Sequence, residues 1–290
     1  MFYASRITWE KLKHELDLFT QEEPISLAPF LIGLNSFIKG EPDNHHFFKE
    51  LNYLSFELEQ LCESDNEEER VDKLNHFFFQ LKSFQILHQD NDELTQDSLL
   101  AESVLTQKRG APLVISLIYT HLAQHLNLPI YLINHPQMCI AKWVRPGSSK
   151  FIDLTRGGKV LNESQVLNFF NRIKNNSKIE IPYLDPLKAK DILELYLNQL
   201  LKTFNKNNRL NPQHILLNLL NQLRPTNLKY ISLRALIRKS LGLNKEAIDD
   251  LKKYFSFSGK TRAPKNLKMA YYELQALKED QTQNKPTQVH

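Results

Sequence analysis

Apolar residues recur at helical spacing through most of the first ninety positions of the chain. An apolar side chain returns every three or four positions, the spacing that places residues on one face of a helix. Aspartate and glutamate favour the first turn of a helix, so the acidic run at 63–70 predicts a turn followed by a helix start. Phe77, Phe78 and Phe79 follow it, and we interpret them as core positions rather than as a partner surface. The pattern predicts helices over 7–19, 24–40, 43–62 and 71–87.

The pattern changes in the middle of the chain. Gly110 and Pro112 separate one helix from the next, because proline is favourable in the first turn of a helix. The following segment, 113–126, is apolar on nearly all sides, which predicts a central, buried helix. Runs rich in β-forming residues come next and are separated by turn residues, which predicts a small antiparallel sheet. The predicted strands are Tyr131–Val144, Lys150–Leu154 and a short strand within 155–161.

Helical periodicity returns in the C-terminal part and includes one pair of helices with a tetratricopeptide-like pattern. The small residues Ala235 and Ala247 allow the two helices to approach closely, and Gly242 lies at the turn between them. A single pair cannot bury both of its faces, so we expect the flanking helices to stack on it. Leu251 and Tyr254 belong to the same pattern, and we assign these five residues to a candidate binding region. The predicted helices are 188–206, 211–222, 227–241, 245–257 and 264–279.

Together the patterns predict a mostly helical α+β protein. Polar residues dominate the end of the chain, which predicts a disordered tail. The expected regions are a helical N-terminal region (1–94), a core with a small antiparallel sheet (95–185), a tetratricopeptide-like helical region (186–280) and the tail (281–290).

Composition narrows the functional classes. The chain has 290 residues, 41% of them apolar and 24% charged, which is close to the average for globular proteins. The net charge of +4 is modest and the basic residues are scattered, so we expect no nucleic-acid partner. Two cysteines are too few for a disulfide framework and fit a reducing compartment. Without an apolar signal segment or a run of roughly 18 apolar residues, the expected location is the cytoplasm, with no membrane contact.

Cys139 is the main candidate for nucleophilic chemistry, since it follows His135 by four positions. On a strand these two residues would share a face but lie about 13 Å apart, too far for a hydrogen bond. Cys139 also stands beside Met138 and Ile140, an apolar setting typical of a buried structural cysteine. We therefore favour burial over catalysis for this thiol.

Metal and phosphate sites have less support. His121 and His125 have the i, i+4 spacing of zinc ligands on a helix, but Leu122 stands where the zinc-protease motif requires glutamate. The segment Thr155–Lys159 contains two glycines but lacks the spacing of a phosphate-binding loop, so a tight turn is predicted. No metal ion or cofactor is expected.

Three segments, taken in order, resemble the SirB family of bacterial proteins. That family combines a helical N-terminus, a transglutaminase-like core and a tetratricopeptide-like C-terminal region. The resemblance covers nearly the whole chain and is strongest between about 99 and 170. The matching segments are Val104–Leu113, Asn127–Pro129 and Asp153–Gly158.

The resemblance implies a catalytic triad of which two positions are vacant. Active transglutaminase-like enzymes place a cysteine at the start of the buried helix, a histidine on the next strand and an aspartate on the following strand. Here the helix start at 110–113 has no cysteine, Met138 occupies the histidine position, and Asp153 alone remains. We expect Asp153 to cap the turn that begins at Leu154, and Cys139 to face the core.

The resulting hypothesis is a non-catalytic, cytoplasmic interaction or regulatory protein with a protein or peptide partner. Its candidate surfaces are the C-terminal helices and the degenerate cleft around Met138 and Asp153. The alternative is a cysteine-dependent hydrolase or acyltransferase that uses a rearranged site with Cys139, His135 or Asp153.

Overall fold

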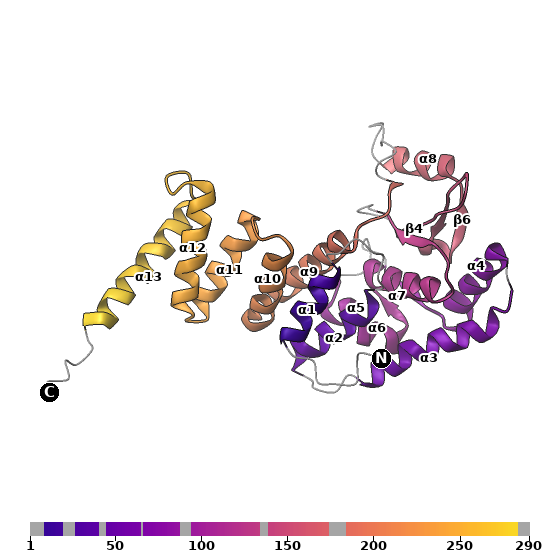
Figure 1. Cartoon of the computed structure of the whole chain (residues 1–290), viewed down its shortest axis with the longest axis horizontal. Helices are drawn as coiled ribbons and strands as arrows, with labels where there is room; N and C mark the ends of the chain where they lie inside the picture. The colour runs from indigo at the N-terminus through magenta and orange to yellow at the C-terminus, as the bar shows by residue number, and fades with distance from the viewer. Residues whose placement is uncertain are drawn as a thin grey trace. The chain divides into compact units, whose positions relative to one another are not determined.

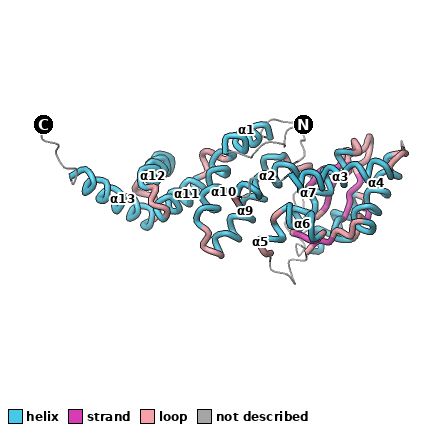
Figure 2. The backbone as a smooth tube through the Cα atoms, turned by 90° about the horizontal axis from the view of Figure 1, so that it is seen from below, coloured by secondary structure: helices cyan, strands magenta, loops and turns pink. Residues whose placement is uncertain are grey.

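The computed structural model (Figure 1) divides the chain into two compact units, Met1–Tyr196 and Leu197–His290. Among the described residues, strands occur only in the first unit, as the magenta segments of Figure 2 show. No described helix is both long enough and apolar enough to cross a membrane. The described residues are 9–19, 27–40, 45–64, 66–87, 94–133, 139–173 and 184–283.

The N-terminal helices form where the apolar period predicts them. They are α1 (Trp9–Phe19), α2 (Ala28–Lys39), α3 (His45–Leu61) and α4 (Glu67–Asn75). Helix α2 ends at Gly40, whose φ of 75° is the left-handed conformation that favours glycine at a helix C-terminus. The apolar spacing of the α3 segment predicts a buried face made of Phe47, Leu51, Leu54, Leu58 and Leu61. The structure differs at both ends of α3, because Phe48 is buried in place of Phe47 and Leu61 is 44% exposed.

The helix predicted over 71–87 is too long. Helix α4 continues into one π-helical turn, η1 (His76–Leu81), and the chain leaves the helix at Ser83, whose φ is 55°. Strand β1 (Gln85–Ile86) follows and pairs in parallel with β2 (Arg109–Gly110). The strand pairing competes with further helix in this segment, and the sequence gives no sign of its distant partner.

The aromatic residues of η1 pack into the core of the first unit. Phe77 and Phe78 are buried, which confirms the core role predicted for them, whereas Phe79 is half-buried. Phe78 stacks on Phe84 with 4.3 Å between the ring centroids, and it meets the ring of Tyr119 edge-on at 5.3 Å. These contacts fix η1 against the central helix.

The central, buried helix is confirmed as α7 (Pro112–His125), which begins with Pro112 at its first position. All of its residues from Val114 to Thr120 are buried. The helix predicted before it is divided into α5 (Gln96–Leu99) and α6 (Ala101–Gln107). The division lies at Leu100, whose backbone is extended with φ −86° and ψ 119°.

A four-stranded antiparallel sheet follows α7, with the strands in sequence order. The single strand predicted over Tyr131–Val144 is wrong, because that run forms two strands that pair with each other, with Leu132 opposite Ala141. Residues 134–138, which include His135 and Met138, lie outside the described residues. The strands are β3 (Ile130–Leu132), β4 (Ile140–Trp143), β5 (Lys150–Asp153) and the predicted short strand β6 (Lys159–Leu161).

Helix α8 (Glu163–Ile173) follows the sheet and was not predicted. A capping box begins it: Asn162 and Gln165 each donate a backbone N–H to the side-chain oxygen of the other, at 2.9 Å. Val166 of this helix packs into an apolar cluster with Ile140, Phe151 and other residues of the sheet. One face of the sheet is thus covered by α8, which lies beside it in Figure 1.

The helices of the C-terminal part form where they were predicted. Helix α9 begins in the first unit and continues into the second. The last described residue, Gln283, still belongs to a helix, and the rest of the tail predicted to be disordered lies outside the described residues. The helices are α9 (Ala189–Lys206), α10 (Leu210–Leu223), α11 (Leu228–Ser240), α12 (Asn244–Ser258) and α13 (Lys265–Gln283).

Candidate functional site

Asp153 is buried at the end of β5 and organises the turn that follows. Its Oδ1 accepts hydrogen bonds from the backbone N–H of Thr155 at 3.0 Å and from the Thr155 hydroxyl at 2.5 Å. Its Oδ2 lies 3.5 Å from Nε of Arg156, whose side chain is exposed. Asp153 therefore caps the short 3₁₀ helix η2 (Leu154–Arg156), as expected from the sequence.

A chain of hydrogen bonds holds the glycine turn that follows η2. The hydroxyl of Tyr119 donates to Oδ1 of Asn75 at 2.7 Å, and Nδ2 of Asn75 donates to the carbonyl of Gly158 at 2.9 Å. Gly158 has a φ of 83°, and a Cβ at this position would lie 2.1 Å from Oδ1 of Asn75. Only glycine fits both the conformation and the space. The predicted tight turn is confirmed.

Tyr119 is suited to a structural role in this chain of bonds. The side chain is fully buried, and burial raises the pKa of its hydroxyl well above the ordinary value of 10, with a smaller contribution from the negative charge of Asp72. The hydroxyl therefore stays protonated near neutral pH and acts as the donor to Asn75.

Cys139 lies just before β4 and beside Ser116 of α7. Burial raises the pKa of the Cys139 thiol to about 12, a hydrogen bond with Ser116 lowers it, and the negative charge of Asp153 raises it. Near neutral pH the thiol is neutral, and a neutral thiol is a poor nucleophile. The prediction that Cys139 faces the core is confirmed.

The start of α7 is closely packed at the position that the resemblance assigns to a nucleophile. A Cβ at Gly110 would lie 2.4 Å from Cγ2 of Val104, and Ala111 is fully buried. Ser116, one turn further along, donates its hydroxyl to the carbonyl of Pro112 at 2.8 Å. Of the predicted site residues in the first unit, the structure brings together Cys139 and Asp153, while Met138 and His135 lie outside the described residues.

His121 and His125 have different surroundings on α7. Nε2 of His121 lies 3.4 Å from the hydroxyl of Ser55, and burial, followed by the charge of His125, lowers the pKa of His121 to about 4. Nε2 of His125 lies 3.4 Å from Oε2 of Glu59. No three histidine, cysteine, aspartate or glutamate side chains gather into a metal site in the described parts of the chain.

The five candidate binding residues of the second unit lie at the contact between α11 and α12. Ala235, Ala247 and Leu251 are almost completely buried, Tyr254 is 9% exposed, and Gly242 lies in the exposed turn with a φ of 73°. The other four residues belong to the hydrophobic core of this unit together with residues of α13. A binding role for these residues stays a prediction. Because most of them are buried, they would affect binding by setting how α11 and α12 pack, and not by direct contact with a partner.

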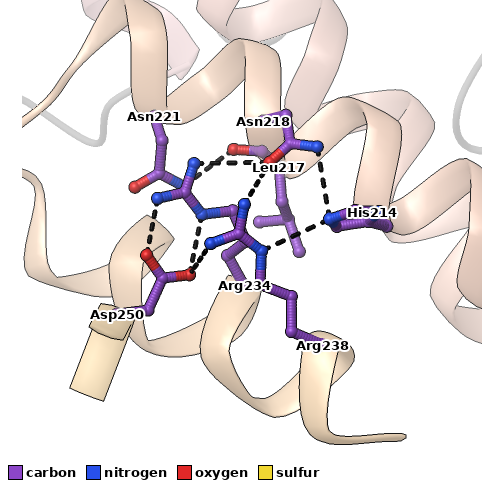
Figure 3. Close-up of polar contacts among 7 residues, drawn as sticks. All are labelled: His214, Leu217, Asn218, Asn221, Arg234, Arg238 and Asp250. Atoms are coloured by element: carbon purple, nitrogen blue, oxygen red, sulfur yellow. Dashed lines mark hydrogen bonds and ion pairs between the residues drawn. The ribbon is translucent and has the colours of Figure 1, made fainter. Parts of the chain in front are cut away.

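A polar network joins α10, α11 and α12 inside the second unit (Figure 3). Arg234 binds Asp250 through two hydrogen bonds, Nε to Oδ2 at 2.9 Å and Nη2 to Oδ1 at 2.6 Å. Arg238 donates from Nη1 to Oδ2 of the same carboxylate at 2.7 Å. The three side chains are only 15%, 16% and 5% exposed, so two largely buried guanidinium groups share one carboxylate.

Neutral side chains of α10 complete the network. Asn218 accepts from Arg234 at 3.3 Å and from Arg238 at 3.2 Å through its Oδ1. Nε2 of His214 lies 3.3 Å from Nε of Arg238, which is a donor, so this nitrogen acts as an acceptor in neutral histidine. Burial and the charges of Arg238 and Arg234 lower the pKa of His214, which favours that neutral form.

Sequence reasoning missed both polar networks. Arg234 and Arg238 are four positions apart on a helix, which places two charges on one face. That spacing was the available signal, but it could not identify Asp250 as the shared partner. Asn75 carried no signal, because its partners are distant in the sequence.

Comparison with known proteins agrees with the architecture of the first unit. The family model described as the transglutaminase-like superfamily matches residues 45–198, more than half of the chain. The matched range contains the central helix, the four-stranded sheet and Asp153. A search among curated proteins found no match. The chain belongs to the transglutaminase-like superfamily.

Proposed function

We propose that this protein is a non-catalytic binding protein, in which the transglutaminase-like domain serves as a scaffold. The observation that carries the proposal is the burial of Cys139 beside Ser116, which also raises the pKa of its thiol. Acyl transfer needs a thiolate with a base within hydrogen-bond reach. Asp153, which would orient such a base, is instead bonded to Thr155, and position 138 is methionine.

Two further properties belong to the proposal. The order of the three matching segments supports the SirB family as the nearer relationship within the superfamily. The use of only two cysteines, neither in a disulfide, supports a cytoplasmic location.

The proposed partner is a protein or peptide that binds the second unit. Stacked helix pairs present extended surfaces whose shape depends on close packing between neighbours. The packing of Ala235 and Ala247 between α11 and α12 supports this assignment. The degenerate cleft that the sequence predicts around Asp153 and Met138 stays the second candidate surface.

A matched pair of substitutions tests the assignment to the second unit. Ala247→Trp would overpack the α11–α12 contact at a cost of about 1–3 kcal/mol or more, whereas Ala276 is exposed on α13, so Ala276→Trp is its control. Capture of a partner by the full-length chain should fall in the first variant and persist in the second. Capture that survives demonstrable loosening of α11 and α12 would move the binding surface to the cleft near Asp153.

The enzyme alternative has its own test. Purified protein would be offered a panel of peptide amides and thioesters, and release of the leaving group would be followed for wild type and Cys139→Ser. We expect no turnover by either protein. Turnover by the wild type that Cys139→Ser abolishes would replace the binding proposal with a cysteine-dependent enzyme.

A further inference from the structure

The division of the chain separates its charges. Leu197–His290 contains 17 Lys and Arg against 6 Asp and Glu, a net charge of +11. Met1–Tyr196 contains 20 Lys and Arg against 27 Asp and Glu, a net charge of −7. The modest total of +4 conceals this difference. A unit of this size with such an excess of basic residues attracts anionic partners.

The basic residues concentrate around the turn between α12 and α13. The segment 251–272 contains six Lys and Arg and no Asp or Glu. Lys260, Arg262 and Lys265 are exposed, and none of the three forms an ion pair with another described residue. Lys268, one turn after Lys265, donates to the carbonyl of Thr261 at 3.2 Å, which ties the turn to α13.

Exposed apolar side chains lie among these charges. Phe257 is 51% exposed at the end of α12, and Met269 and Tyr272 of α13 are 51% and 57% exposed. Lys265, Met269 and Tyr272 follow one another at spacings of four and three positions, which places them on one face of α13. Nζ of Lys260 lies 4.8 Å from the centroid of the Tyr272 ring, so the turn and this face are adjacent.

From this arrangement we infer that the α12–α13 surface binds an acidic peptide segment that carries apolar side chains. The surface consists of Phe257, Lys260, Arg262, Lys265, Met269 and Tyr272. The inference rests on the proposed binding function and names the chemistry of its partner. The carboxylates of the peptide would pair with the basic side chains, and its apolar side chains would contact Phe257, Met269 and the ring of Tyr272.

A peptide fits this surface better than a single-stranded nucleic acid does. Binding of single strands relies on aromatic rings that are open for base stacking. Here Nζ of Lys260 lies over one face of the Tyr271 ring and one face of the Tyr272 ring, 5.1 Å and 4.8 Å from their centroids, which leaves less ring area for a base. Phe257 and Met269 add apolar area that a peptide side chain can bury and a phosphate cannot.

Fluorescence polarisation with the full-length chain tests the inference. The probe is a labelled twelve-residue peptide made of three Glu-Leu-Asp-Phe repeats. A second peptide has serine in place of leucine and phenylalanine, and a labelled twenty-nucleotide oligouridylate is the third probe. The variants are Lys260→Glu with Lys265→Glu, and a control pair, Lys229→Glu with Lys245→Glu, which makes the same charge change at exposed positions elsewhere in the unit.

We expect the first pair to weaken binding of the apolar acidic peptide at least tenfold and the control pair less than threefold. Met269→Gln should weaken that peptide and leave the serine peptide unchanged. Equal losses in both pairs, no binding by the wild type, or tighter binding of the oligouridylate would overturn the inference. If the Lys260→Glu, Lys265→Glu double variant still captured a partner, the inference about this surface would be wrong, but the proposed binding function would remain on another surface. Cysteine-dependent turnover would instead overturn the proposed binding function itself.

Discussion

The backbone N–H of Leu154 donates to the backbone carbonyl of Cys139 at 2.9 Å. This bond fixes the start of η2 to the residue that precedes β4. The Cys139 thiol beneath it is buried beside Ser116. The end of β5 and the start of β4 thus meet at a buried thiol whose pKa is raised by its burial.

Thiol reactivity is the direct test of this enclosure. Because burial raises the pKa of this thiol to about 12, very little thiolate is present at pH 8, and burial also slows access to it. In a Cys62→Ser background, Cys139 should react with a disulfide reagent only when urea unfolds the protein. The wild type should show one additional, faster thiol, Cys62, which is only half-buried. Rapid labelling of native Cys139 would contradict its placement in the core.

Asp153 should matter for stability and not for binding. Asn retains an oxygen that can accept from Thr155, so Asp153→Asn should lower the free energy of unfolding by at most about 1 kcal/mol. Asp153→Ala removes the cap and should cost about 1–2 kcal/mol. Thermal melts and peptide binding measured together separate the two roles. If Asp153→Asn removed binding while the melting temperature stayed constant, the residue would belong to a functional site.

Gly158 and Gly157 form a matched pair for the turn. Both have left-handed φ values, 83° and 65°, but only a Cβ at position 158 meets another atom, Oδ1 of Asn75. Gly157→Ala should cost about 1 kcal/mol, the penalty of the backbone conformation alone. Gly158→Ala adds the steric conflict and should cost about 2–4 kcal/mol. Urea unfolding measures both variants, and equal costs would show that Asn75 can move aside.

His121 should make the first unit less stable in mild acid. Its pKa is lowered from 6.5 to about 4 in the folded protein, so between these values the unfolded chain binds a proton that the folded protein does not. The free energy of unfolding therefore carries no penalty from His121 above pH 6.5. It falls as the pH drops toward 4, by at most about 3 kcal/mol from this residue. His121→Gln should flatten the stability profile over this range, and His76→Gln, at an exposed position, should not. An unchanged profile in His121→Gln would assign the acid sensitivity to other groups.

Asp250 should be the most sensitive position of the polar network. Asp250→Asn leaves the largely buried Arg234 and Arg238 without their shared carboxylate and should cost about 2–4 kcal/mol. The neighbouring Asp249 is exposed, so Asp249→Asn should stay within about 0.5 kcal/mol. Circular dichroism during urea unfolding measures both. A small effect of Asp250→Asn would mean that water or another anion replaces the carboxylate.

The helices were predictable because their signal is local. Three examples each lie within one or two helical turns: the apolar spacing of three and four positions in α3, the proline that opens α7, and the small residues of α11 and α12. The missed helix α8 also had a local signal, since Asn162 and Gln165 have the spacing of a capping box. Pro136 likewise marked the break in the run Tyr131–Val144, because proline disfavours a continuous strand.

The polar contacts were not predictable in the same way. Arg234 and Asp250 are 16 positions apart on different helices, and a charge pattern on one helix does not select its partner on another. The charge difference between the two units was visible in composition only after the structure had placed the boundary at Leu197. In the total charge of the chain, the negative charge of the first unit cancels most of the positive charge of the second unit.

The hydrogen bonds at Gly158 also bear on the order in which the first unit folds. Asn75 lies 44 positions from Tyr119 and 83 positions from Gly158, so their contacts close long loops of chain. Such contacts form slowly, and during synthesis Asn75 and Tyr119 emerge from the ribosome before Gly158 does. We therefore expect the turn to complete its hydrogen bonds late, after the helices and the sheet have assembled. Amide exchange at Gly158, whose N–H is bonded to the carbonyl of Asp153 at 3.0 Å, should consequently report the opening of the whole domain rather than local fraying.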